Sequence, residues 1–229
     1  MRNHILAFQR AINAPERCPF PVIAAVHGPV IGLGLDIISA CDVRYAASNA
    51  TFCIKVCVRT GVKCGFELIY LMIKEVDVGL AADIGSLAHL PKITSNNSLA
   101  RELAYTARTF SAAEADKLGL VSKVVEGGRE GVVKAALELA KSIATKSPVA
   151  IAGTKRLLIH SRDHSVPANL EYTSIWNGAM LHTEVFIIEL FWYFLGLLIT
   201  HAVHFTGLEG SRYGSGDKIE GATEFPASA

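Results

Sequence analysis

The feature of this sequence that most constrains its fold is a continuous apolar run, Pro19 to His27 (PFPVIAAVH), which Gly28 and Pro29 close. A strand with one solvent-facing side alternates apolar and polar residues, whereas a strand covered on both faces is apolar throughout. The run therefore predicts a buried parallel strand.

The segments after this run alternate between strand and helix patterns. Further strands are expected at Val43–Tyr45, Thr51–Ile54 and Leu120–Val125. A short apolar helix is expected to open at Gly32, and helix-spaced apolar residues beyond Asp83 predict helices at Ser98–Ala107, Ser111–Lys117, Arg129–Thr145 and Val149–His160. Ser111 and Glu114 have the spacing of a capping box. Strands that alternate with helices predict an α/β fold, followed by a helical C-terminal region.

The composition excludes several classes of protein. With 51% hydrophobic and 19% charged residues the chain is globular and not disordered. A formal net charge of +1 gives no reason to expect nucleic acid as a partner. The five cysteines form no CxxC pair and have no histidine cluster beside them, so we expect neither a disulfide framework nor a metal site.

Two segments bear on targeting and membrane insertion. The first residues lack the apolar core of a signal peptide and the Arg-rich character of a transit peptide, so no targeting signal is visible. Val185–Phe205 has close to the roughly 20 apolar residues that a bilayer span needs. Glu189, His201 and His204 interrupt it, which argues against a transmembrane helix, although a tail-anchored protein stays open as an alternative.

The turn after the first strand can carry chemistry. Gly32-Leu33-Gly34 enters a short helix that bears the carboxylate of Asp36. Such a turn can direct backbone N–H groups at an anion or a polarised carbonyl. The alternative is that the glycines serve close packing.

A second pair of acids follows. Glu75 and Asp83 lie eight positions apart in an otherwise apolar stretch, where an unpaired carboxylate is costly. Burial raises the pKa of a carboxyl group towards the range that suits proton transfer. The alternative is that Asp83 caps a helix at Ile84–Leu90 and that Glu75 lies on the surface. Asp42 and Arg44, by contrast, are expected to be structural.

Taken together, these segments resemble the crotonase (enoyl-CoA hydratase/isomerase) superfamily. The resemblance runs from about Glu16 to Glu184 and rests on motifs that occur in order: PVIAAVHG, the Gly-x-Gly-x-Asp helix, ACDVRY, EVDVGLAADIGSLAHLP, ELAYTAR, GLVSKV, KSPVAI and SRDHSV. Hydratases of the family usually have Glu at the position of Asp36 and no acid at the position of Asp83. The acid at Asp83 makes the resemblance closest to the dienoyl-CoA isomerases.

The resemblance implies roles for the acids. Asp83 would remove a C2 proton from the acyl-CoA, Glu75 would deliver one at C6, and Asp36 would tune both. Gly32, Leu33 and Gly34 would form the substrate-binding turn, with the Leu33 N–H as an oxyanion donor. No metal and no cofactor would be needed, since coenzyme A is part of the substrate. The family further implies a homo-oligomer (trimer or hexamer) in a peroxisome or mitochondrion.

The chain also departs from the family pattern. Leu33 stands where the family has glycine, and the crotonase-like ββα spiral core is expected to lack its N-terminal strands, which would supply the second oxyanion N–H. Val56–Lys74 intervenes where the family runs directly into the Glu75 motif. Codons for Val-Cys can begin with the GT that starts an intron, and a codon for Lys can end with the AG that ends one. The insertion is therefore either a translated intron or a genuine loop, and sequencing of the transcript would distinguish the two.

The sequence thus predicts a partial crotonase-like domain over residues 1–184, with the insertion at 56–74, and an unrelated tail over 185–229. The predicted function is isomerisation of 3,5-dienoyl-CoA to 2,4-dienoyl-CoA in fatty-acid β-oxidation, with activity impaired by the departures. An enoyl-CoA hydratase and a non-catalytic remnant or partner subunit are the alternatives.

Overall fold

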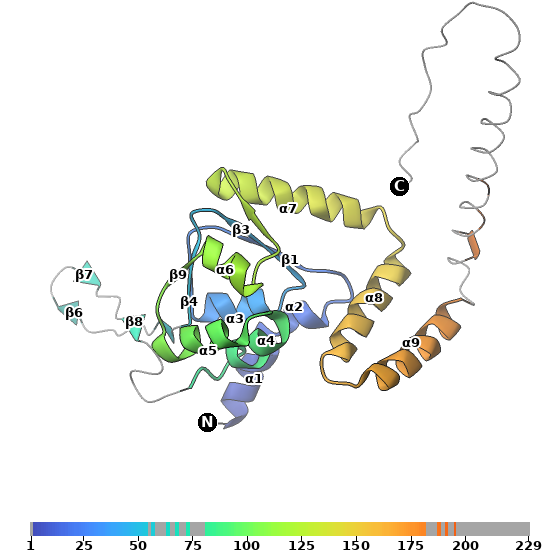
Figure 1. The fold of residues 1–229 in the computed structure, drawn as a ribbon, viewed down its shortest axis with the longest axis horizontal. Helices are drawn as coiled ribbons and strands as arrows, with labels where there is room; N and C mark the ends of the chain where they lie inside the picture. Colours follow the sequence, from blue (N-terminus) through green and yellow to red (C-terminus); the bar gives the residue numbers. More distant parts are fainter. Residues whose placement is uncertain are drawn as a thin grey trace, which may run out of the picture. The chain divides into compact units, whose positions relative to one another are not determined.

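A computed structural model of the chain describes residues 2–54 and 81–181, together with the short stretches 56–57, 63–64, 67–68, 72–73 and 187–188 and the single residues 191 and 195 (Figure 1). The chain divides into two compact units, residues 1–174 and residues 175–229. Both sheets described below and the candidate site belong to the first unit.

Two three-stranded sheets form the centre of the first unit. The first sheet is wholly parallel and has the order β1 (Ile23–Val26), β3 (Val43–Ala47), β10 (Lys123–Val125). The second has the order β2 (Pro29–Ile31), β4 (Thr51–Cys53), β9 (Phe110–Ser111), with β2 parallel and β9 antiparallel to β4. Four two-residue strands pair antiparallel, β5 with β8 and β6 with β7: β5 (Val56–Cys57), β6 (Lys63–Cys64), β7 (Glu67–Leu68) and β8 (Met72–Ile73).

The strand predicted from the apolar run is present and parallel, but it is shorter and less buried than predicted. It covers Ile23–Val26, and within it only Val26 is buried. The reason is its position: β1 is the edge of its sheet, so among the described residues it has β3 as its one strand neighbour. β2 lies where the sequence pattern indicated only a turn.

Between residues 95 and 161 the described helices follow the sequence prediction closely. Their bounds are α1 (Arg2–Ile12), α2 (Ala14–Arg17), α3 (Leu33–Ser39), α4 (Ser86–Ile93), α5 (Asn97–Thr106), α6 (Ala112–Leu118), α7 (Gly128–Ala144), α8 (Pro148–Ser161) and α9 (Val166–Met180). The predicted helices at α5, α6, α7 and α8 are each confirmed to within a residue or two, whereas α1, α2 and α9 have no counterpart among the predictions.

The predicted capping box explains why α6 begins where it does. The Ser111 hydroxyl accepts from the Glu114 N–H at 3.2 Å, and the Glu114 carboxylate accepts from the Ser111 N–H at 3.1 Å. Two N–H groups that lack a partner within the helix are thereby satisfied. Gly119, at φ +80°, ends the helix in a left-handed conformation that a residue with a Cβ rarely adopts.

The core lies between the sheets and the helices α3, α5 and α6. Phe52 and Phe110, which are paired residues on β4 and β9, stack with ring centroids 5.4 Å apart, and both are fully buried. Leu35 of α3 and Leu103 of α5 are also fully buried in this core. Because Leu35 is the neighbour of Asp36, packing of the core holds the helix that carries the first candidate acid.

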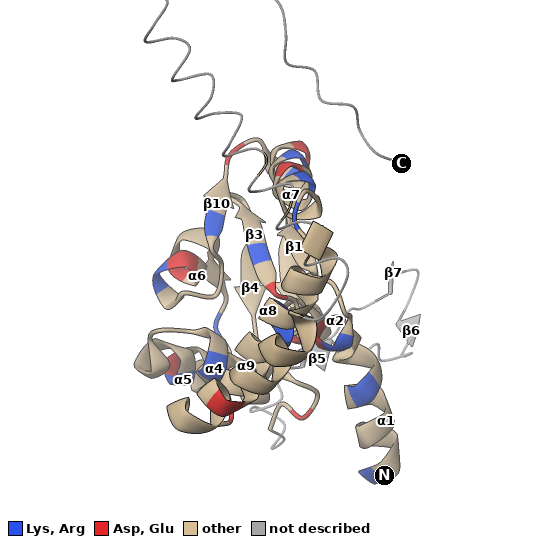
Figure 2. Cartoon of the chain, turned by 90° about the vertical axis from the view of Figure 1, so that its right-hand side faces the viewer, with Lys and Arg blue, Asp and Glu red and all other residues tan. Residues whose placement is uncertain are grey.

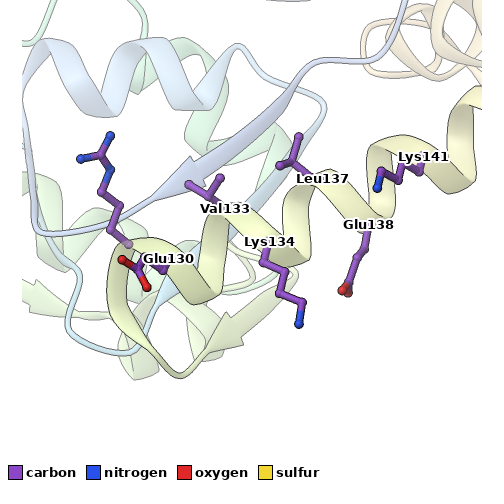
Figure 3. Close-up of a pocket in the computed structure, with 7 residues that line it drawn as sticks. Glu130, Val133, Lys134, Leu137, Glu138 and Lys141 are labelled. Carbon is purple, nitrogen blue, oxygen red and sulfur yellow. The ribbon is translucent and has the colours of Figure 1, made fainter.

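Helix α7 covers the parallel sheet, against which it buries Val132 and Ala136 (Figure 1). Basic and acidic residues alternate along it (Figure 2). A shallow hollow of about 560 Å³ follows the outer side of α7, where Val133 and Leu137 lie between charged side chains (Figure 3). Helix α7 supplies the described lining residues, and neither Asp36 nor Asp83 is among them.

Candidate active site

The turn that enters α3 depends on its two glycines. Gly32 precedes the helix at φ +53°, a conformation that favours glycine. Its N–H donates to the Cys53 carbonyl at 3.0 Å, which ties the turn to β4. A Cβ at Gly34 would come within 3.3 Å of Val30 Cγ1, tighter than most real contacts. Here the glycines allow close packing, as the alternative interpretation expected, and they also shape the start of the helix.

Leu33 is the first residue of α3, and its side chain is 38% exposed. The first N–H groups of a helix have no partner within it. The described residues supply no backbone acceptor for the N–H of Leu33 or of Gly34. Both residues lie at the position where the sequence predicts an oxyanion donor, and that role stays a prediction.

Asp36 lies one turn into α3 and is only 7% exposed. Its Oδ1 accepts two hydrogen bonds, from the Ser86 N–H and from the Ser86 hydroxyl, each at 2.6 Å. Ser86 is the first residue of α4, so the carboxylate of one helix satisfies the N-terminus of another.

Asp83 lies three residues before α4, with an exposed side chain. Its backbone carbonyl accepts from the Gln9 side-chain amide of α1. The alternative in which Asp83 caps this helix is wrong, because the N-cap residue is Gly85 and no side chain caps from that position. The carboxylate of Asp36 instead accepts the N–H of Ser86, the first residue of the helix.

Glu75 lies outside the described residues, so its distance from the other two acids stays a prediction. Most of the insertion Val56–Lys74, and most of the tail over residues 185–229, also fall outside them, as does the predicted domain boundary at residue 184. Of the three predicted acids, the structure connects Asp36 to the start of α4, three residues after Asp83.

A polar cluster that the sequence analysis missed lies beside this turn. His89 of α4 makes a 2.9 Å contact between its Nε2 and Asn13 Oδ1, and its Nδ1 lies 3.5 Å from the carboxylate of Glu16. Arg162, at the end of α8, donates to the same carboxylate at 2.6 Å. Burial lowers the pKa of His89, and the neighbouring Glu16 partly opposes this.

A sequence signal for this cluster does exist. Gln9, Asn13 and Glu16 lie at the i, i+4, i+7 spacing of one helix face, and all three reach towards the segment between Asp83 and His89. Apolar periodicity does not detect such a face, because its members are polar.

The conclusion that Asp42 and Arg44 are structural is confirmed. Asp42 accepts from the Val22 N–H at 2.7 Å and from Lys155 Nζ at 2.8 Å. Arg44 donates to the Leu120 carbonyl at 2.6 Å, which joins β3 to the segment before β10. Both side chains thus hold the parallel sheet together.

One apolar hollow adjoins α3. It measures about 510 Å³ and is lined by residues of β1, β2 and α3, namely Ala24, Ala25, Val26, His27, Pro29, Val30, Ile31, Gly34, Ile37, Ile38 and Cys41. It borders Gly34, but neither Asp36 nor Asp83 lines it. The hollow therefore does not by itself define where a substrate would lie.

Within the described residues, no group of three or more His, Cys, Asp or Glu side chains is arranged to hold a metal ion. Over the same part of the chain, no helix has the length and apolar character to cross a membrane. The apolar segment Val185–Phe205 lies largely beyond that part.

The comparisons with known proteins agree with one another. Residues 4–185 match the protein family described as Enoyl-CoA hydratase/isomerase, so the match begins earlier than the predicted Glu16 and includes most of α1. The chain is 48% identical over 184 residues to the mitochondrial Delta(3,5)-Delta(2,4)-dienoyl-CoA isomerase of Homo sapiens, covering 80% of this chain and 50% of that protein. It is 44% identical to the peroxisomal enzyme of that name from Arabidopsis thaliana, covering 80% of this chain and 59% of that protein.

Solved structures extend the similarity to the fold. The crystal structure of an enoyl-CoA hydratase from Bacillus anthracis superimposes with a TM-score of 0.66 at 26% identity, covering 80% of this chain and 62% of that one. The chain spans about half the length of the dienoyl-CoA isomerases from Homo sapiens and Arabidopsis thaliana that it matches.

Proposed function

Since the chain belongs to the enoyl-CoA hydratase/isomerase family, we propose that it isomerises 3,5-dienoyl-CoA to 2,4-dienoyl-CoA, a step of fatty-acid β-oxidation. The observation that carries the proposal is the bond between Asp36 and Ser86. It brings the carboxylate of α3 to the turn that bears Asp83, the acid that separates the predicted isomerase from the hydratases. The names of the relatives from Homo sapiens and Arabidopsis thaliana support the same reaction.

The proposed reaction is a pair of proton transfers. Backbone N–H groups at the start of α3, with Leu33 foremost, would stabilise the negative charge that develops on the thioester oxygen. The exposed carboxylate of Asp83 would accept the C2 proton, and Glu75 would return a proton at C6. Both double bonds then move by one position, so atoms and charge balance. The proposal needs no metal or redox group, because coenzyme A belongs to the substrate.

The test measures the absorbance of the conjugated dienoyl thioester after the purified chain is mixed with 3,5-dienoyl-CoA. Asp83→Asn removes the proposed base and should lower kcat by at least about 100-fold, the lower end of what general acid–base catalysis contributes. Folding should be unaffected, because Gln9 contacts the Asp83 backbone carbonyl and not its side chain. Asp116→Asn on the exposed side of α6 is the matched control and should leave kcat unchanged.

The alternatives give different results in the same experiment. Water addition to a 2-enoyl-CoA, with no diene migration, would identify a hydratase, the name given to the Bacillus anthracis structure. A folded chain that catalyses neither reaction would favour the non-catalytic remnant or partner subunit. Equal activity of Asp83→Asn and the unsubstituted chain would contradict the assigned base.

The proposal extends to location and assembly. The Homo sapiens relative is named mitochondrial and the Arabidopsis thaliana relative peroxisomal, and we propose that this chain works in one of these organelles. Co-localisation of the expressed chain with markers of each would decide between them. Its proposed partners are the acyl-CoA substrate and further copies of itself in a trimer or hexamer, which light scattering coupled to size-exclusion chromatography would detect.

A further inference from the structure

Ser86 lies at the junction between α3, which bears Asp36, and the turn that bears Asp83. We propose that Ser86 is a positioning residue for the isomerisation: its hydroxyl and its N–H fix the Asp36 carboxylate against the Asp83 turn. This inference rests on the proposed function, because it assigns to Ser86 the placement of that reaction's acids.

Two donors from one residue meet one oxygen. The Ser86 N–H and hydroxyl both donate to Oδ1 of Asp36 at 2.6 Å, the short end of the range for hydrogen bonds to a charged acceptor. Ser86 is 2% exposed and Asp36 is 7% exposed, so water competes poorly for either group. The two bonds therefore fix both the position and the rotation of the carboxylate.

Both bonds from Ser86 reach Oδ1, which leaves the second oxygen of Asp36 outside this anchor. Among the described residues the recorded bonds of this carboxylate all reach Oδ1. No buried side-chain oxygen or nitrogen in that part of the chain lacks a partner, so Oδ2 keeps access to its surroundings. A carboxylate held by one oxygen presents the other in a defined direction.

The same anchor restrains Asp83. Asp83 precedes Ser86 by three residues, a separation that extended chain spans in at most about 11 Å. On the far side, Gln9 donates to the Asp83 carbonyl. The turn between Asp83 and Ser86 is thus held at both ends, and Ser86 is the end that also contacts the other acid.

Atoms from three segments surround Gly85, the residue before Ser86. A Cβ at this position would lie 3.6 Å from three atoms: Asp36 Oδ1, Asn13 Oδ1 and His89 Cδ2. Atoms from α3, α4 and the residue that joins α1 to α2 therefore converge on the turn. A serine at position 86 contributes a hydroxyl to this junction and adds little volume.

The kinetic test compares three variants of the full chain. Ser86→Ala removes the hydroxyl but keeps the N–H, and should lower kcat on the order of tenfold while KM stays within about twofold, because one hydrogen bond to a charged group is lost. Ser86→Thr keeps the hydroxyl and should restore kcat to within about threefold. Ser86→Cys, a weaker donor of similar size, should fall between them and serves if Ser86→Ala does not fold.

A second measurement does not depend on activity. Hydrogen exchange of the Ser86 amide should accelerate on the order of tenfold in Ser86→Ala and in Asp36→Asn, with little further change in the double variant, because both substitutions weaken one anchor. If the unsubstituted chain shows no isomerase activity, the proposed function fails, whereas this exchange cycle still decides whether the anchor exists. Additive effects in the cycle, an unchanged kcat in Ser86→Ala, or no rescue by a folded Ser86→Thr would each overturn the assignment.

Discussion

Replacing Lys155 by methionine should destabilise the first unit by about 3 kcal/mol. Lys155 Nζ of α8 donates to the carbonyls of Pro15 at 2.8 Å and Phe20 at 3.0 Å, and it lies 2.8 Å from Asp42 Oδ2. The lysine side chain is 5% exposed and that of Asp42 20%. Removing one partner of a buried ion pair costs about 3–5 kcal/mol. The lower end applies, because Asp42 keeps its bond from Val22 and some access to water.

Urea denaturation followed by circular dichroism measures this cost. With a slope of about 2 kcal/mol per M, a loss of 3 kcal/mol lowers the midpoint by about 1.5 M. Circular dichroism reports on helix content, and most of the described helical residues lie in the first unit, whereas Trp176 lies in the second unit and would report on that unit by fluorescence. Lys134→Met, an exposed change on α7, is the control and should move the free energy of unfolding by no more than about 0.5 kcal/mol.

A double variant tests the reasoning itself. Lys155→Met combined with Asp42→Asn removes the charge that the single change strands, so it should cost less than the sum of the two single changes. Strict additivity, or a midpoint for Lys155→Met within about 0.3 M of the unsubstituted chain, would refute the conclusion that Lys155 and Asp42 form a buried pair.

Two further predictions concern single helices. Burial holds the pKa of His89 in the folded chain below its ordinary value of about 6.5, so the unfolded chain binds a proton at His89 more readily than the folded chain does. The stability that neutral His89 contributes is therefore present above pH 6.5 and is lost as the pH falls through the lower folded value. Unfolding measured from pH 7.5 to pH 5 should therefore depend less on pH in His89→Gln, and an unchanged slope would contradict this. Ser111→Ala removes half of the capping box of α6 and should cost about 1 kcal/mol, or about 0.5 M in the urea midpoint, whereas an exposed Ala113→Ser should not.

Features whose partners lie a few residues apart could be predicted from the sequence. The capping box joins Ser111 to Glu114, and Pro148 and Gly119 mark a helix start and a helix end through their own backbone preferences. The motifs likewise predicted the enoyl-CoA hydratase/isomerase family and an α/β fold, and both are confirmed. Helix α1 was not predicted, although Ile5, Phe8 and Ile12 have the apolar spacing of a helix.

The candidate site likewise combines features that the sequence shows with features that only the structure shows. Its acids are visible as residue types in the sequence, because charged groups are rare in apolar segments. Whether Asp83 serves as a helix cap could not be decided there, since the carboxylate that accepts the first N–H of α4, that of Asp36, lies 50 positions from Ser86. Similarly, no local pattern pairs Lys155 with Asp42, which are 113 positions apart.

The family, the α/β alternation and the identities of the acids therefore follow from the sequence itself. The sequence predicts that a turn at Gly32 joins an apolar strand to the helix that bears Asp36. Only the tertiary structure showed that β1 is an edge strand and that Asp36 is anchored by Ser86. The physical reason is that helix caps and turns depend on neighbours along the chain, whereas strand burial and carboxylate placement depend on which distant segments the core brings together.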